Sequence, residues 1–253
     1  MKSRLPGIYL RRTIALTVFL GLWELSARAG YIDPFYMPAP SAIGFLLWDQ
    51  FASGNIWPHL HATFGAALLG LALGLLTGII IGFMAALMPY LAELLEPVMA
   101  MLNAIPRVIL APLFIIWLGI DLSSKVALSF ILVVVLTFFA VYNGIRDVDQ
   151  RLVERVITLG GNRWMLLRDV YVPSVVSWVM GNLKVAVGFA FTGAVVGEFV
   201  ASSRGLGYLL SYAQSTYNAA LTMALITLIM VFVMFLFTIA GMLERYLLRW
   251  KYR

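Results

Sequence analysis

Six long apolar stretches alternate with shorter polar segments along the chain. A transmembrane helix needs about 20 mostly apolar residues, and the stretches that meet this requirement are 13–29, 64–87, 91–120, 126–145, 175–201 and 219–243. The pattern therefore predicts an all-α membrane protein with six transmembrane helices. Pro97, Pro106 and Pro112 interrupt the third stretch, and because an internal proline removes a helix hydrogen bond, we expect that span to be broken or kinked.

The segment between the first two spans, residues 31–61, is too polar to cross a membrane. It contains Pro38-Ala39-Pro40-Ser41 followed by an amphipathic pattern, so we expect Ser41 to cap a short interfacial helix outside the membrane. His59 and His61 are the only histidines of the chain. We place them in this loop, where two histidines at positions i and i+2 without a nearby carboxylate make a poor metal site.

The first apolar stretch has an alternative interpretation as a cleaved signal peptide. Basic residues precede an apolar core at 14–23, and Ala27-Arg28-Ala29 has the form of a cleavage site. Cleavage would leave five spans and place the two termini on opposite sides of the membrane.

Composition narrows the class of protein. Of the 253 residues, 62% are apolar and 12% are charged, against about 25% charged in soluble domains, which excludes a soluble globular enzyme. The 18 Lys and Arg residues lie mainly at the ends of the apolar stretches, not in the single stripe expected of a nucleic-acid-binding protein. With the N-terminus inside, the basic residues gather on the cytoplasmic side, so both termini are expected to be cytoplasmic.

Small residues recur on one face of two predicted spans. Gly70, Gly74, Gly78 and Gly82 are spaced four apart, and the fifth span carries Gly193 and Gly197. Such faces let helices approach closely in lipid, so we expect tight packing there; a moving gate on the same faces is the alternative.

Ionisable residues inside a membrane are costly and indicate function. The candidates for a translocation path are Asn103, Arg107, Thr137, Lys184, Thr192 and Glu198. For Arg107 the alternative is a structural bridge to a carboxylate or to backbone carbonyls. Glu198 is better suited to an interhelical hydrogen bond or a gate, because its charge repels an anion.

The connection between the fourth and fifth spans, residues 146–173, is the longest polar loop on the cytoplasmic side. Asp147 and Asp149 lead into a short helical pattern that ends at Leu159. Gly160-Gly161-Asn162 supplies residues that tolerate a left-handed conformation, and a second helix begins at Arg163 and ends before Pro173. The pattern predicts a helix-turn-helix, for which a simple solvated loop is the alternative.

The spacing within this loop is specific. Glu154, Gly160 six residues later and Val170-Tyr171-Val172-Pro173 after nine more resemble the cytoplasmic EAA loop of the membrane subunits of binding-protein-dependent ABC importers. Further resemblance to the nitrate/sulfonate/taurine branch lies in residues 38–41, 105–119, 197–198 and 205–207. Arg155 and Val156 depart from the two alanines of the motif.

The resemblance implies a type I ABC importer transmembrane domain at 57–245. An N-terminal transmembrane helix and periplasmic interfacial segment (1–56) precede it, and a basic cytoplasmic tail (246–253) follows. In the family two membrane subunits pair, here as a homodimer, two cytoplasmic ATPases hold ATP and Mg, and a periplasmic or lipid-anchored binding protein delivers the solute across the bacterial inner membrane. The residues implied to contact the ATPase are Glu154, Arg155, Leu159, Gly160, Gly161, Asn162, Arg163, Trp164 and Pro173.

The residues themselves agree that this chain is not an ATPase. A P-loop needs a lysine followed by serine or threonine, and among four lysines the only such pair is Lys2-Ser3. We therefore expect a non-catalytic membrane subunit without a bound cofactor or metal. The resemblance implies a sulfonate-, taurine- or nitrate-like anion as substrate, with a thiamine pyrimidine precursor or an aromatic acid as alternatives. A secondary transporter is the more distant rival, since no inverted repeat is found.

Overall fold

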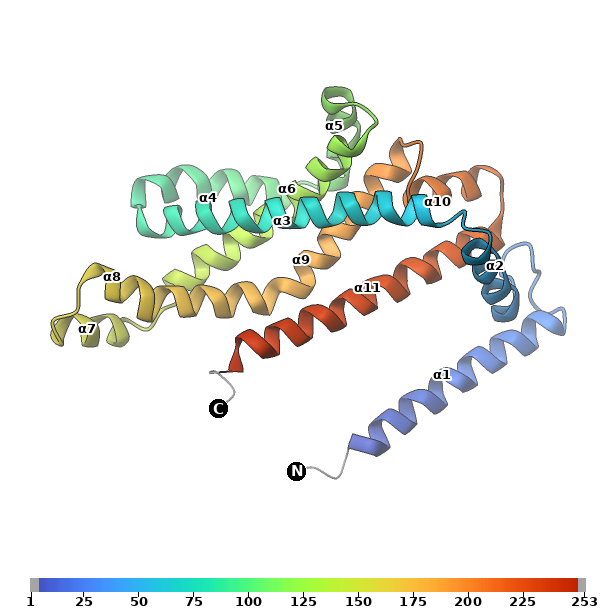
Figure 1. Cartoon of the computed structure of the whole chain (residues 1–253), viewed down its shortest axis with the longest axis horizontal. Helices are drawn as coiled ribbons and strands as arrows, with labels where there is room; N and C mark the ends of the chain where they lie inside the picture. The colour runs from blue at the N-terminus through green and yellow to red at the C-terminus, as the bar shows by residue number, and fades with distance from the viewer. Residues whose placement is uncertain (1–4, 250–253) are drawn as a thin grey trace. The chain divides into compact units, whose positions relative to one another are not determined.

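The computed structural model describes residues 5–249, apart from the side chains of residues 5–9 and of Arg107. Every regular element in that range is helical (Figure 1). In chain order these are α1 (Leu5–Arg28), α2 (Pro40–Ala52), α3 (Trp57–Leu87), α4 (Pro89–Ala104), η1 (Arg107–Leu110), α5 (Ala111–Leu118), α6 (Leu122–Arg146), α7 (Gln150–Thr158), α8 (Arg163–Leu166), η2 (Leu167–Tyr171), α9 (Val172–Val200), α10 (Leu206–Ser215) and α11 (Ala219–Leu247).

Four helical segments in the described range are long and apolar enough to cross a membrane: Trp57–Leu87, Leu122–Arg146, Arg163–Val200 and Ala219–Leu247. A fifth candidate is the bent pair formed by α4 and the segment that follows it. The expected count of six is therefore not reached by length and composition. The predicted first span does form a helix, α1, but Arg11, Arg12, Glu24 and Arg28 leave only residues 13–23 as an uncharged run.

The predicted break in the third span is confirmed. α4 ends at Ala104, Pro106 precedes the 3-10 turn η1, and Pro112 lies in the first turn of α5. The helices on the two sides of the break meet at 91°. Pro97 lies inside α4 without ending it. The helix therefore breaks at Pro106. Pro112 lies at the start of α5, where the helix does not need an N–H donor from that residue.

Two compact units divide the chain, residues 1–58 with 209–230 and residues 59–208 with 231–253. In the first unit α1 contacts α2 through Glu24. Its carboxylate accepts hydrogen bonds from the Ser41 backbone N–H at 2.9 Å, from the Ser41 hydroxyl at 2.7 Å and from Arg28 Nε at 2.6 Å. Glu24 therefore satisfies a free N–H at the start of α2.

The prediction that Ser41 caps α2 is wrong. The N-cap residue is Ala39, whose side chain makes no capping hydrogen bond, and Pro40 begins the helix. Ser41 lies within the first turn, because Pro40 is compatible with the first helical position. The capping oxygen comes instead from Glu24, 17 residues earlier in the sequence, which the local pattern does not reveal.

In the second unit α3 packs on α6 through the predicted glycine face. Gly70, Gly74, Gly78 and Gly82 are all buried. A Cβ added at Gly74 would lie 2.6 Å from Val133 Cβ, which shows how closely the two helices approach. The glycine spacing therefore has the packing role that the sequence predicts.

α9 packs on the other side of α6 by similar means. Gly193 faces the backbone of α6, where an added Cβ would lie 2.6 Å from Ser129 Cα. The Ser129 hydroxyl donates to the carbonyl of Ala190 at 2.8 Å, so its polar group is satisfied inside the apolar interface. Helices α3, α6, α9 and α11 share one buried core, which includes Ala66, Val133, Leu183, Ala190 and Ala240.

Two elements differ from the sequence prediction. α3 begins at Trp57, so His59 and His61 lie in its first two turns and not in a loop. α10, which follows the fifth span, was not expected. The predicted basic tail lies outside the described residues from position 250 onward.

Candidate functional site

The loop predicted to form a helix-turn-helix does so. α7 is capped by Asp149, whose Oδ1 accepts a hydrogen bond from the Arg151 N–H at 2.9 Å. At its other end Leu159 is the C-cap and Gly160 takes a φ of +80°, a conformation that favours glycine.

Paired backbone hydrogen bonds stabilise the turn. The Gly160 N–H donates to the Ile157 carbonyl at 2.9 Å and the Gly161 N–H donates to the Val156 carbonyl at 2.8 Å, which is the Schellman arrangement. Of the three residues expected to be left-handed only Gly160 is so; Gly161 is not, and neither is Asn162. It has a φ of −94° and its Oδ1 accepts the N–H of Met165 at 2.9 Å, so it caps α8.

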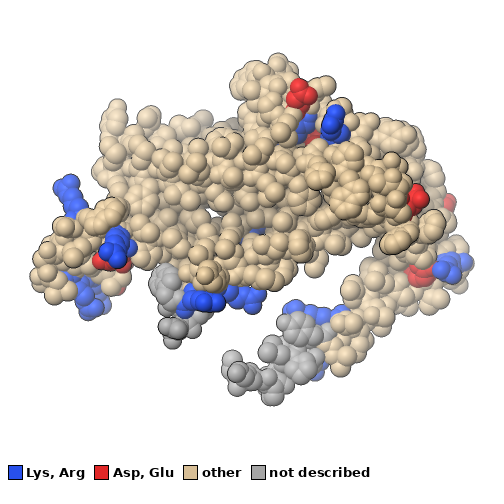
Figure 2. Space-filling model, viewed as in Figure 1, with Lys and Arg blue, Asp and Glu red and all other residues tan. Residues whose placement is uncertain are grey.

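This segment, residues 150–166, exposes apolar side chains and basic ones together. Leu159 is 80% exposed and Trp164 is 66% exposed, and no residue of α7 or α8 is buried. Figure 2 shows Lys and Arg side chains gathered over α7 and α8. Glu154, Arg155 and Arg163 are exposed as well. A large apolar side chain held in the open among charges is typical of a protein–protein contact surface.

The sequence predicted that the second helix of the loop ends before Pro173 and is separate from the fifth span. This prediction is wrong. α8, the π-helical turn η2 and α9 follow one another without interruption, and residues Arg163–Val200 form one 38-residue helical segment. The wider turn lies directly before Pro173, where it accommodates the proline ring and its missing N–H.

Among the predicted path residues, Glu198 is buried and accepts more than one hydrogen bond. It is 2% exposed, and its Oε2 accepts hydrogen bonds from the Thr63 hydroxyl at 2.8 Å and from the Gly207 N–H at 3.0 Å. Thr63 Oγ1 also accepts the N–H of Leu206 at 2.9 Å. The carboxyl group therefore links α9 to the start of α10 and to α3. An interhelical hydrogen bond of this kind is one of the two roles that we expected for Glu198 from the sequence.

Three partners in this region were not among the predicted residues. Thr63 lies four residues after His59 on the same face of α3, and the His59 ring accepts the Gly205 N–H through Nδ1 at 3.0 Å. His59 also stacks on Tyr208 with ring centroids 5.9 Å apart. Lys125 is 2% exposed and donates to the carbonyl of Ile120. The Gly205-Leu206-Gly207 motif was the available signal, since glycines at these positions indicate close approach of backbone to another group.

Lys184 is already paired. Its Nζ lies 2.9 Å from Oε2 of Glu244 on α11, and the two side chains are 46% and 19% exposed. Gly241 makes room for the contact, since a Cβ there would lie 3.0 Å from Lys184 Cε. The lysine charge is therefore balanced within the same chain.

The remaining path candidates come from four different elements, α9, α6, α4 and η1. Thr192 is exposed on α9 and donates to the Gly188 carbonyl at 2.9 Å. Thr137 is 2% exposed and packs against Gly78 of α3. Asn103 is exposed near the end of α4, and Arg107 is the first residue of η1.

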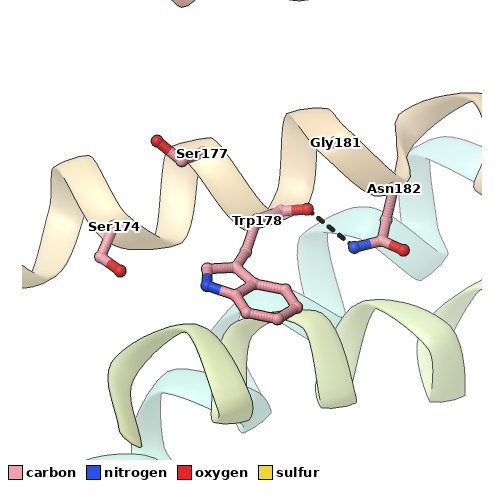
Figure 3. A pocket seen from close by; sticks show the side chains of 5 residues that line it. All are labelled: Ser174, Ser177, Trp178, Gly181 and Asn182. Carbon is pink, nitrogen blue, oxygen red and sulfur yellow. Dashed lines mark hydrogen bonds between the residues drawn. The ribbon is translucent and has the colours of Figure 1, made fainter. Parts of the chain in front are cut away.

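A hollow of about 450 Å³ lies on the first half of α9 (Figure 3). The residues that line it are Ser174, Ser177, Trp178, Gly181 and Asn182. None of them is charged, and all lie within three turns of η2, where the helix emerges from the loop.

Comparisons with known proteins agree with the fold. Residues 74–251 match the family of binding-protein-dependent transport system inner membrane components. The riboflavin transport system permease protein RibX of Chloroflexus aurantiacus is 37% identical, over 94% of this chain and 89% of that protein. The putative aliphatic sulfonates transport permease protein SsuC of Escherichia coli is 32% identical, over 92% of this chain and 88% of its own length.

A solved structure shares the fold. The inward-facing MetNI methionine ABC transporter aligns with a TM-score of 0.60 at 18% identity, over 76% of this chain and 93% of the matched chain. The family match covers most of the sequence and includes the loop whose spacing and geometry are described above. The chain belongs to the family of inner membrane components of binding-protein-dependent transport systems, and its fold is that of a type I ABC importer membrane domain.

Proposed function

We propose that this chain is the non-catalytic membrane subunit of an ATP-driven importer in a bacterial inner membrane. Two copies form a homodimer, both termini face the cytoplasm, and a periplasmic or lipid-anchored binding protein delivers the solute. ATP and Mg are bound by two separate ATPase subunits. The observation that carries the proposal is the α7–α8 segment, which holds Trp164 in the open at the end of a continuous 38-residue helix.

The segment 150–166 is the docking site for the ATPase in this proposal. Trp164 and Leu159 enter a groove of the partner, and Arg163 offers charge-assisted hydrogen bonds at its rim. Glu154 and Arg155 lie on the exposed side of α7. The Schellman turn at Gly160 and Gly161 fixes the angle between the two short helices, so the surface is ready before the partner binds.

Closure of the ATPase pair would then move α8 and α9 together, since no loop separates them. Two arrangements of the spans, open to the inside or to the outside, would differ in how they bind the nucleotide-loaded ATPases. Alternating access follows because ATP favours one arrangement and hydrolysis returns the other.

The substrate in this proposal is a small solute. A sulfonate-, taurine- or nitrate-like anion is the class that the sequence favours, and a thiamine pyrimidine precursor or an aromatic acid is the alternative. The names of the relatives cover riboflavin and aliphatic sulfonates, which supports an organic solute and leaves its charge to be argued from the residues.

The test uses the chain co-expressed with the ABC ATPase subunit proposed as its partner. We expect the two proteins to purify together, and we expect reconstituted vesicles to take up solute only with ATP. Trp164→Asp should abolish co-purification, whereas Trp178→Phe, outside the docking segment, should leave it intact. Uptake by this chain alone without ATP, or unchanged co-purification of Trp164→Asp, would refute the proposal.

A further inference from the structure

The hollow on α9 presents a set of groups that suits one kind of ligand. The Trp178 side chain is 39% exposed and supplies an apolar ring. Its inner edge is fixed, since a Cβ at Gly144 of α6 would lie 2.8 Å from Trp178 Cδ1. A ring that packing holds in place is a good surface for stacking a second flat ring.

The polar groups of the hollow are partly committed and partly free. Ser174 Oγ donates to the Gly144 carbonyl at 2.5 Å. Asn182 Nδ2 donates to the Trp178 carbonyl at 2.9 Å (Figure 3), which leaves Asn182 Oδ1 as an acceptor. Ser177 makes no hydrogen bond within the described part of the chain, and its hydroxyl can donate and accept. The free groups match a ligand edge that carries both an N–H and a C=O.

The charges around the hollow exclude an anionic ligand. The lining residues are uncharged, and Lys184, two residues beyond Asn182, is bound to Glu244 at 2.9 Å. An anion held in an apolar surrounding needs an unbalanced cation or several strong donors. The hollow offers neither, because the Glu244 carboxylate cancels the nearby ammonium.

We propose that the α9 hollow is a contact site for an uncharged, flat ring with an amide-like edge, which stacks on Trp178 and hydrogen bonds to Ser177 and Asn182. This rests on the proposed importer function, and it favours the ring-containing alternative named there over the sulfonate-, taurine- or nitrate-like anion. The site lies just beyond the ATPase-docking segment on the same helix, so occupancy is sensed by the helix that the ATPase moves.

The experiment is equilibrium dialysis of the purified permease–ATPase complex in lipid nanodiscs. The probes are riboflavin and thymine, which are rings with N–H and C=O groups on one edge, and taurine, which carries a sulfonate. We expect saturable binding of the two rings and none of taurine. Ser177→Ala should weaken ring binding up to about tenfold, the usual effect of one lost hydrogen bond, and Trp178→Leu should weaken it at least as much.

Matched variants separate the site from the fold. Ser177→Ala removes a hydroxyl without an intramolecular partner, so it leaves the fold intact, and Ser203→Ala, at an exposed position after α9, is the control that should bind normally. Glu244→Gln frees the Lys184 charge and should create taurine binding. The double variant Lys184→Gln with Glu244→Gln should lose it again.

The outcomes distinguish the two proposals. Taurine binding to the unaltered complex, absence of binding by both rings, or unchanged ring binding in Ser177→Ala and Trp178→Leu would overturn the site while ATP-driven uptake could persist. Absence of any ATP-driven uptake would overturn the proposed importer function. The dialysis would still show whether the α9 hollow binds the two rings.

Discussion

Gly205 stands where only a residue without a side chain leaves room for Glu198. Its φ is +123°, and a Cβ added there would overlap the Glu198 carboxyl group. Gly207 is similarly placed, with its added Cβ 2.8 Å from Glu198 Cβ. The turn before α10 is thus shaped around one buried carboxyl group.

Gly205→Ala should therefore destabilise the protein strongly. The left-handed conformation alone costs an L-residue about 1–2 kcal/mol, and overpacking adds about 1–3 kcal/mol. Thermal denaturation of the purified protein in detergent would show a lowered midpoint. Gly54→Ala is the matched control, since Gly54 has a φ of +80° but open space around it, and it should show the conformational cost alone. Equal shifts for the two variants would contradict the close fit of Gly205 to Glu198.

The α3–α6 contact predicts a second pair of variants. A Cβ at Gly78 would lie 2.6 Å from Thr137 Cβ, so Gly78→Ala should lower the denaturation midpoint, by about 1–3 kcal/mol of overpacking. Adding Thr137→Ala should not restore the midpoint, because the clash is with Cβ, which alanine keeps. Adding Thr137→Gly should restore it, because glycine has no Cβ. Gly65→Ala, on the same helix with nothing within 4 Å, should leave the midpoint unchanged or raise it slightly, because alanine favours a helix over glycine by about 0.5–1 kcal/mol.

Tyr142 ties α6 to α4 near the docking segment. Its hydroxyl donates to Glu96 Oε2 at 2.7 Å and accepts from Arg146 Nη1 at 2.8 Å. Without that hydroxyl the Glu96 and Arg146 side chains are left 3.9 Å apart. Tyr142→Phe should cost about 1–2 kcal/mol, measured by thermal denaturation. The double variant Tyr142→Phe with Glu96→Gln should add little, and full additivity would argue against a shared network.

Gly160→Pro should abolish transport without preventing membrane insertion. Proline fixes φ near −65°, whereas Gly160 has a φ of +80°, so the Schellman turn cannot form. ATP-driven uptake and co-purification of the ATPase measure the effect.

Gln150→Pro is the control in the same loop. Gln150 is the first residue of α7 and follows an extended N-cap, a position that proline tolerates, so transport should persist. Normal uptake by Gly160→Pro would show that the turn is dispensable.

Local patterns predicted much of the fold. The four long apolar helices, the glycine face of α3, the break at Pro106 and the end of α7 at Leu159 follow from periodicity, small-residue spacing, proline and glycine. These signals act over a few residues, so the sequence carries them directly. The helix-turn-helix of residues 150–166 was predicted for the same reason, since its turn is specified by local residues.

What the sequence did not reveal depends on partners far along the chain. Ser41 was expected to cap α2, but Glu24 does so from another helix. Lys184 was expected on a translocation path, and its partner Glu244 lies 60 residues later. The burial of Lys125 beside Glu198 likewise requires that α6 and α9 be packed together, which hydropathy alone does not specify.

The unbroken course of Arg163–Val200 has a geometric consequence. At 1.5 Å per residue, 38 residues give about 57 Å of helix measured along its path, and this path bends within α9 (Figure 1). In the proposed importer, a movement at the surface that carries Trp164 would pass into α9 without an intervening loop, because the helical hydrogen bonding continues from α8 through η2.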